Sequence, residues 1–426
     1  MKHLNIEFFG FVFSGYQQYM TQIVGAVKLR AGRPGQFLNW IDLPQKQIGR
    51  VDHIYDLVAR SKDATGANKL VVLGIGGSKH PIEHALSING LNIDGTDVLF
   101  WSDIDSLSVN RLMKRIGDVT RAVFLVVSKS GTTFETTDAL KRVKKMLVDE
   151  YAARGDATPD ICASKHFIAV TDADAERSSL RRTSDTEKWL GDLYIHDDVG
   201  GRFSAFDDHV LFALAFAGMK RDDMVSMLIS AAEMSERSLS ESINENVAVQ
   251  MALFWAVASQ QGVADFVHLY MGDVFEKTVL WHTQMQNESI KNTRMQIAKI
   301  PDAMHHSAEA HFNDANKYAV AITMPVDTGV CAENANAYEN AIAKSYSAIG
   351  PTVCEYVSVD GLGLTVGAAG ALTQMRAFAT IYQEVVRHVL NGAENPDVLQ
   401  SVLQPYVEVY KQNLKGGVVV PGRMSE

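Results

Sequence analysis

The chain has 426 residues and a mass of 46.8 kDa, which is enough for two domains or one large one. Its hydrophobic content of 46% and charged content of 21% are those of an ordinary globular protein. A net charge of −10 argues against general binding to nucleic acid or an anionic membrane, and no apolar run is long enough to cross a bilayer.

The cysteines and the N-terminal stretch bear on the cellular compartment in which the protein is expected. Cys162, Cys331 and Cys354 lie far apart without CxxC spacing, so neither a disulfide framework nor a cysteine zinc site is indicated. The first residues read poorly as a signal peptide, because Glu7 and the polar residues 14–18 interrupt their apolar pieces. We therefore expect a cytoplasmic enzyme or binding protein.

The first part of the chain predicts helices and then strands that alternate with helices. Residues 1–45 are expected to form a helical segment that breaks near Pro44. Helices are then expected at 54–64 and from about Pro81, where proline suits the first turn. Apolar segments of strand length occur at 69–73, 97–101, 122–125, 166–172 and 193–196.

The second part repeats this alternation after a helical stretch. Residues 206–261 read as mostly helical, and a last helix is expected from Pro396 to Lys415. Between them we expect strands at 266–270, 318–323 and 352–357, and helices from about Asn334 and Val366. The pattern predicts an α/β fold of doubly wound parallel sheets. The expected divisions are an N-terminal segment at 1–45, a first domain at 46–205, a second at 206–394 and a C-terminal helix and tail at 395–426.

The stretch Ser128-Lys129-Ser130-Gly131-Thr132-Thr133 joins a predicted strand to a predicted helix. Free N–H groups at a helix N-terminus, together with several hydroxyls, make a suitable cradle for a phosphate, and Gly131 can take the tight turn. An ordinary Ser/Thr helix cap is the alternative. Four hydroxyls in six residues favour the phosphate.

The stretch Gly74-Ile75-Gly76-Gly77-Ser78 also follows a strand, and Asp103 ends the next one. These features invite a dinucleotide-binding interpretation, but Lys79 stands where that fingerprint needs its third glycine. A close backbone approach to a small phosphorylated ligand fits the stretch better.

Two further candidates are charged. In Gly200-Gly201-Arg202-Phe203-Ser204, the arginine follows two glycines and can face a phosphate or a developing oxyanion; an interdomain salt bridge is the alternative. Gln284 and Glu288 are four residues apart and share one face of a helix, although a lone glutamate is usually solvated surface.

The stretch from Met304 to His311 is rich in histidine, but it lacks His-Glu-x-x-His and its histidine spacing is irregular for one helical face, which argues against a metal site. In the last predicted helix, Gln404 and Lys411 are seven residues apart and project from one face. A solvated charged face is the alternative for this helix.

In this order the motifs resemble the phosphoglucose isomerase (glucose-6-phosphate isomerase) family, over about residues 40–415. The resemblance implies two sugar-isomerase (SIS) domains, each a three-layer αβα arrangement, packed together. It also implies interconversion of glucose 6-phosphate and fructose 6-phosphate through ring opening and a cis-enediolate, with no cofactor and no metal.

The resemblance assigns each candidate residue a role. Glu288 would move the proton between C1 and C2, Arg202 would stabilise the enediolate, and His306 with Lys411 would open the ring. Gln284 would help to fix the substrate, and Gly77 and Ser78 would line the sugar. The phosphate would be held by Ser128, Lys129, Ser130 and Thr133.

The chain departs from the family pattern at two places. Where the family has Glu-Ser-x-Gly-Lys, residues 288–292 read Glu-Ser-Ile-Lys-Asn, and Tyr406 replaces a usual glycine. His305 also competes with His306. The family takes this histidine from a neighbouring subunit, which implies a homodimer. The alternatives are a relaxed isomerase that also accepts mannose 6-phosphate, and a non-catalytic SIS-type sugar-phosphate sensor.

Overall fold

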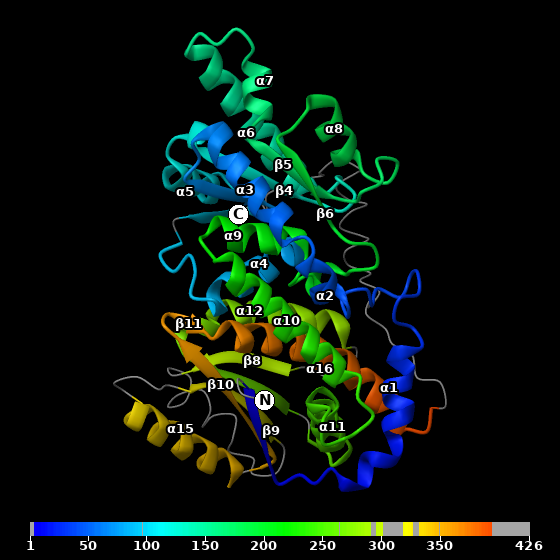
Figure 1. Cartoon of the computed structure of the whole chain (residues 1–426). Helices are drawn as coiled ribbons and strands as arrows, with labels where there is room; N and C mark the ends of the chain where they lie inside the picture. The colour runs from blue at the N-terminus through cyan, green and yellow to red at the C-terminus, as the bar shows by residue number, and fades with distance from the viewer. Residues whose placement is uncertain are drawn as a thin grey trace, which may run out of the picture.

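A computed structural model of the chain describes residues 4–95, 97–263, 265–290, 295–300, 318–326, 332–348 and 350–393. Two parts, each built on a sheet, lie one above the other in Figure 1, with α4, α9, α10, α12 and α16 between them. Among the described helices, none has both the length and the apolar character that a membrane crossing requires.

The first sheet is fully parallel, with strand order β3-β2-β4-β5-β6. Its strands are β2 (Lys69–Leu73), β3 (Val98–Trp101), β4 (Ala122–Val127), β5 (Phe167–Thr171) and β6 (Gly191–Tyr194). The order of strands along the chain reverses between β2 and β4. At such a switch point the loops that follow the two strands diverge and leave room for a ligand.

Helices cover both faces of the first sheet because alternate strand residues point to opposite sides. Leu70, Val72 and Leu125 belong to one apolar core, while Val71 and Phe124 belong to the other. The first face is covered by α3 (Val51–Thr65), α4 (His80–Ile88) and α9 (Asp208–Phe216). The second is covered by α5 (Ser106–Ile116), α6 (Phe134–Ala153), α7 (Pro159–Ser164) and α8 (Ser179–Glu187).

The second sheet has the order β1-β10-β9-β7-β8, with β11 paired to β10. Its strands are β1 (Leu4–Phe9), β7 (Asp265–Met271), β8 (Met295–Ile300), β9 (Tyr318–Val326), β10 (Thr352–Asp360) and β11 (Gly363–Leu364). β7 to β10 are parallel and repeat the strand order of the first sheet, whereas β1 and β11 are antiparallel to β10.

The second sheet also has a helix layer on each face. α15 (Ala332–Ser347) covers the outer face, and the inner face carries α11 (Val247–Gln260), α12 (Glu276–Ser289) and α16 (Val366–Leu390). α10 (Arg221–Ser238) packs along α16, as both views show. The remaining elements are α1 (Met20–Lys28), α2 (Leu43–Ile48) and the 3-10 helices η1 (Ser14–Tyr19), η2 (Gly76–Ser78), η3 (Val119–Arg121), η4 (Gly201–Phe203) and η5 (Asp273–Phe275).

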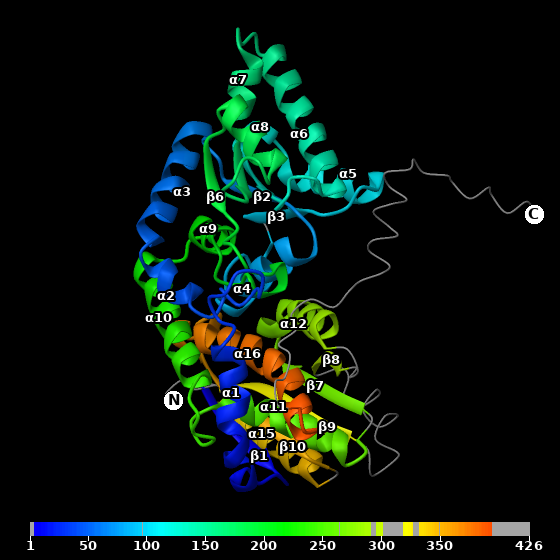
Figure 2. The same cartoon turned by 90° about the vertical axis from the view of Figure 1, so that its right-hand side faces the viewer.

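The predicted α/β class with doubly wound parallel sheets is confirmed, but the expectation of a wholly helical segment at 1–45 is wrong. Leu4, Ile6 and Phe8 alternate with polar residues, and β1 uses this alternation to pair at the edge of the second sheet (Figure 2). β8 was not predicted. The expected helix at 396–415 lies outside the described residues.

Candidate active site

The serine-rich loop lies at the carboxyl end of β4, where α6 begins. Gly131 adopts a left-handed φ of 71°, and the Ser128 hydroxyl accepts the Gly131 N–H at 3.1 Å. Ser128 Oγ also lies 3.0 Å from Thr133 Oγ1. From the next strand, the Thr171 hydroxyl donates to the carbonyl of Ser128 at 2.8 Å. The loop is therefore held in one conformation by its own hydroxyls and by β5.

The first turn of α6 is suited to an anion. Thr133 occupies the N-cap position, but its side chain makes no capping hydrogen bond to the turn. Lys129 and Ser130 are exposed beside it, and Lys129 Nζ lies 5.9 Å from the centre of the Phe37 ring. The N-terminus of a helix, with its positive dipole end and backbone N–H groups, forms a favourable site for a phosphate when a lysine lies beside it.

The glycine-rich stretch after β2 lies beside this loop, and its backbone closely approaches the backbone of the Arg202 loop. A Cβ placed on Gly77 would lie 2.7 Å from the carbonyl carbon of Gly201, and one on Gly76 would lie 3.2 Å from Gln284 Nε2. Any side chain at Gly77 would therefore force the two loops apart. Glycine here allows η2, η4 and α12 to meet.

At this meeting point Arg202 and Glu288 form an ion pair, with Nη1 3.3 Å from Oε2. Arg202 Nε donates to Ser289 Oγ at 2.9 Å, and Gln284 Nε2 donates to Glu288 Oε1 at 3.0 Å. The Trp281 indole donates to the Arg202 carbonyl at 2.9 Å. Three residues of α12 therefore fix the backbone and the side chain of Arg202, and Gln284 orients one of them, Glu288.

The site is only partly open to solvent. The side chain of Arg202 is 13% exposed and that of Glu288 is 32% exposed. Burial lowers the pKa of the Arg202 guanidinium and Glu288 offsets this only in part, yet an arginine remains charged at any physiological pH. Arg202 Nη2 and Gln284 Oε1 are buried without a hydrogen-bond partner among the described residues. Such orphaned groups are uncommon in proteins, and here they point to a polar ligand.

A second polar cluster connects α12 to α4 and α16. The His84 ring stacks on Trp281 with ring centroids 4.0 Å apart, and its nitrogens lie 2.9 Å from the hydroxyls of Thr278 and Thr373. Burial lowers the pKa of His84 to about 3, so this imidazole is neutral near pH 7. It therefore orients Trp281 and carries no charge toward the site.

One group of described side chains has the composition of a cation site: His196, Asp207 and Asp208 offer ligand atoms that all lie within 4.8 Å of one another. The Arg50 guanidinium already neutralises Asp208, with Nε 2.9 Å and Nη2 2.5 Å from its carboxylate oxygens. His196 Nδ1 lies 2.5 Å from Asp207 Oδ1. Because each carboxylate already has its own partner, we assign no metal to this group.

The structure brings together most of the residues that the sequence singled out. Gly77, Arg202, Gln284 and Glu288 meet directly. The loop with Ser128, Lys129, Ser130 and Thr133 follows the strand next to the one that leads into Ser78. His306 and Lys411 lie outside the described residues.

The sequence analysis missed several residues that position the pair. Ser289 and Trp281 contact Arg202 directly, and Ser289 stood next to a residue already chosen. Sequence spacing from Glu288 places Trp281 two turns earlier on the same helix, which is a signal that could have identified it.

Comparison with known proteins identifies a family. Residues 58–310 match the model of the family described as Phosphoglucose isomerase. The glucose-6-phosphate isomerase of Staphylococcus aureus (strain NCTC 8325 / PS 47) is 28% identical over 257 residues, 58% of this chain and 54% of that protein. The enzyme of that name from Streptococcus pneumoniae serotype 4 is 26% identical over 305 residues, 69% of this chain and 64% of that protein. The matches thus span between about half and two thirds of these relatives' length.

Solved structures share the fold. The hypothetical protein TT0462 from Thermus thermophilus superposes with a TM-score of 0.77 at 20% identity, over 97% of this chain and 99% of that one. A glucose-6-phosphate isomerase from Chlamydia trachomatis gives a TM-score of 0.68 at 18% identity, over 93% of this chain and 77% of that one. At these identities the likeness concerns the fold alone.

Proposed function

The chain belongs to the phosphoglucose isomerase family, and from this membership we propose that it interconverts glucose 6-phosphate and fructose 6-phosphate. One observation carries the proposal: a glutamate and an arginine are paired at 3.3 Å, and the buried Nη2 of the arginine has no hydrogen-bond partner within the described part of the chain. Aldose–ketose isomerisation needs a carboxylate that moves a C–H proton and a fixed cation for the enediolate charge.

The loop at 128–133 would hold the phosphate at C6. Its helix N-terminus, hydroxyls and Lys129 supply hydrogen bonds and positive charge at a distance from the reacting carbons. Binding energy from this remote group can then position C1 and C2 against the Arg202–Glu288 pair. Gly77 and Ser78 would line the sugar between these two points.

In the aldose-to-ketose direction, Glu288 would remove the proton from C2 as the C1 carbonyl electrons move onto oxygen. The resulting cis-enediolate carries negative charge, and Arg202 Nη2 would donate to it. Glu288 would then return the proton to C1, and the proton on O2 would pass to O1, so that the C2 carbonyl and the C1 hydroxyl form together. Gln284, which donates to Glu288 Oε1, would hold the carboxylate in one orientation during both transfers.

Ring opening, subunit arrangement and location are proposed from the family resemblance. His306 and Lys411 would remove a proton from O1 and supply one to O5. A homodimer would bring the histidine of one subunit to the site of the other, and the reducing cytoplasm suits a chain whose three cysteines show no disulfide pattern.

A coupled assay that starts from fructose 6-phosphate and detects glucose 6-phosphate tests the proposal. We expect turnover by the wild-type protein without added metal. Folded protein that binds fructose 6-phosphate but produces no glucose 6-phosphate would contradict the proposal and support a sugar-phosphate sensor. Because residues 288–292 depart from the family pattern, mannose 6-phosphate should be assayed in parallel to detect relaxed specificity.

A further inference from the structure

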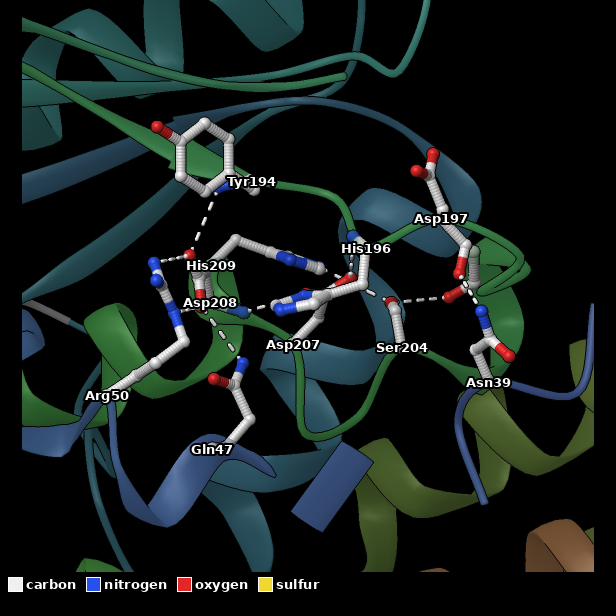
Figure 3. A network of polar contacts seen from close by, with 11 residues as sticks. Asn39, Gln47, Arg50, Tyr194, His196, Asp197, Ser204, Asp207, Asp208 and His209 are labelled. Atoms are coloured by element: carbon white, nitrogen blue, oxygen red, sulfur yellow. Dashed lines mark hydrogen bonds and ion pairs between the residues drawn. The ribbon is translucent and has the colours of Figure 1, made fainter. Parts of the chain in front are cut away.

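The loop that carries Arg202 is closed at its base by one buried carboxylate (Figure 3). Asp207 is fully buried, and its Oδ1 lies 2.5 Å from His196 Nδ1. The Asp207 carboxylate also accepts the backbone N–H of His196 at 3.3 Å and that of Asp208 at 3.0 Å. Asp207 thereby ties His196, two residues after the end of β6, to Asp208, the first residue of α9, and the Arg202 loop lies between these two points.

Ser204 fixes the middle of the same loop. Its hydroxyl lies 2.6 Å from the Gly201 carbonyl and 3.4 Å from the Gly77 carbonyl. His209 Nε2 lies 3.4 Å from the same hydroxyl, and His209 is itself buried. Gly201, the residue before Arg202, is therefore held through Ser204 by His209 in the first turn of α9. Asp207 joins the two ends of the loop.

The neighbouring carboxylate has a different task. Asp208 is also fully buried, but it accepts from Arg50, from Gln47 Nε2 at 2.9 Å and from the Tyr194 N–H at 3.1 Å. Burial would raise the pKa of Asp208, yet Arg50 and Gln47 outweigh it and hold this pKa below its usual range. Asp208 thus fastens α9 to α2 and to the start of α3, outside the Arg202 loop.

We propose that Asp207 and His196 are positioning residues, which fix the Arg202 loop so that its guanidinium meets the enediolate. This inference rests on the proposed function, because it assumes that Arg202 receives an anion. It assigns the two adjacent buried aspartates different roles: Asp207 positions Arg202, and Asp208 stabilises the fold.

Calorimetric binding of two linear sugar phosphates tests the inference without turnover. Arabinonate 5-phosphate carries a carboxylate where the enediolate charge develops, and arabitol 5-phosphate has a neutral hydroxymethyl group there. We expect the wild-type protein to prefer the carboxylate, and Arg202→Ala to lose this preference. His196→Ala and Asp207→Ala should each reduce the preference by about tenfold, as expected for a displaced charged hydrogen bond, with little change for arabitol 5-phosphate.

Two further variants separate positioning from folding. His196→Asn keeps a donor near the place of Nδ1, so its preference should return to within about threefold of the wild-type value. Asp208→Asn is the matched control at the adjacent buried carboxylate: it should lower the melting temperature and leave the preference unchanged. Since His196 has a side chain that is 26% exposed, His196→Ala serves if Asp207→Ala does not fold.

The outcomes are distinguishable. No preference in the wild-type protein would contradict the proposed function, and the inference with it. A wild-type preference that survives His196→Ala would contradict the inference alone, as would an equal loss in Asp208→Asn. Loss in His196→Ala and Asp207→Ala, with recovery in His196→Asn, supports the inference.

Discussion

Two polar networks support the two elements that carry the Arg202–Glu288 pair, the Arg202 loop and α12, and they are built differently. The loop-side network consists of His196, Asp207, Asp208 and Arg50; apart from Arg50, its members lie close together in the sequence. The helix-side network consists of Arg376, Glu355, His268, Tyr270 and His282 of α12, and it joins residues far apart in the sequence. His268 and Arg376, for example, are separated by 108 positions. The difference shows that a loop can be fixed by its own sequence neighbours, whereas a helix needs partners from several elements.

The helix-side network is also drier. Arg376 and Glu355 have side chains that are 2% and 0% exposed, and Arg376 Nη1 donates to Glu355 Oε1 at 2.7 Å. On the loop side Asp208 is fully buried, but the Arg50 side chain is 28% exposed. Removal of one partner should therefore cost more on the helix side.

The largest stability loss is expected for Arg376→Met. This change leaves Glu355 buried without its cation and should reduce the free energy of unfolding by about 3–5 kcal/mol. Urea unfolding measures the loss. The double variant Arg376→Met with Glu355→Leu removes both charges and should recover much of it. A double variant less stable than the single one would contradict the account.

Gly77→Ala tests the close contact between the glycine-rich stretch after β2 and the Arg202 loop. The new Cβ would lie 2.7 Å from Gly201 C, so the loops must separate and Arg202 must move. Displacement of a positioning group by about 1 Å costs roughly 100-fold in rate, and kcat should fall by about that factor. Gly25→Ala is the control and should keep normal turnover, because Gly25 is helical and the added Cβ would meet no described atom within 4 Å beyond the backbone of its own helix.

Arg50→Met should have a smaller effect than Arg376→Met. Asp208 keeps its hydrogen bonds from Gln47 and Tyr194, and water reaches the site of the lost guanidinium. We expect a loss of about 1–3 kcal/mol in urea unfolding. A loss equal to that of Arg376→Met would show that the two networks do not differ in this way.

The smallest expected effect is a pH dependence of the stability that His196 contributes to the loop-side network. Burial would lower the pKa of His196, but Asp207 outweighs it, so this pKa lies above its usual value of 6.5. The His196 contribution to stability is therefore full below pH 6.5 and is lost as pH rises through the raised pKa. The stability difference between wild type and His196→Ala should shrink over that rise; a growing difference would contradict the assignment.

The helix-side histidines titrate in the opposite sense. Burial lowers the pKa of His268 and His282 well below 6.5, with Arg376 contributing. Their contribution is full above pH 6.5 and is lost as pH falls below it. The two networks thus differ in pH response as well as in exposure.

The sequence allowed prediction of the sheets and of the loops that follow their strands, because buried strands are continuous apolar runs and the loops are rich in glycine and serine. It also singled out Arg202 and Glu288, whose side chains the structure pairs. The sequence did not predict the buried polar residues that hold the Arg202 loop and α12 in place. Asp207 and Asp208 read as an ordinary helix start, and the partners of Arg376 are brought together only by the folded sheet. β1 was missed because its partner, β10, lies more than 300 residues away.

Proton exchange at the substrate carbons tests the central claim most directly. In deuterated water, wild-type protein should introduce deuterium at C2 of glucose 6-phosphate and C1 of fructose 6-phosphate, as followed by NMR. Glu288→Gln should slow this incorporation by about 10³-fold, within the range for removal of a general base, while arabitol 5-phosphate still binds. Near-normal incorporation by folded Glu288→Gln would contradict the assignment of Glu288 as the base.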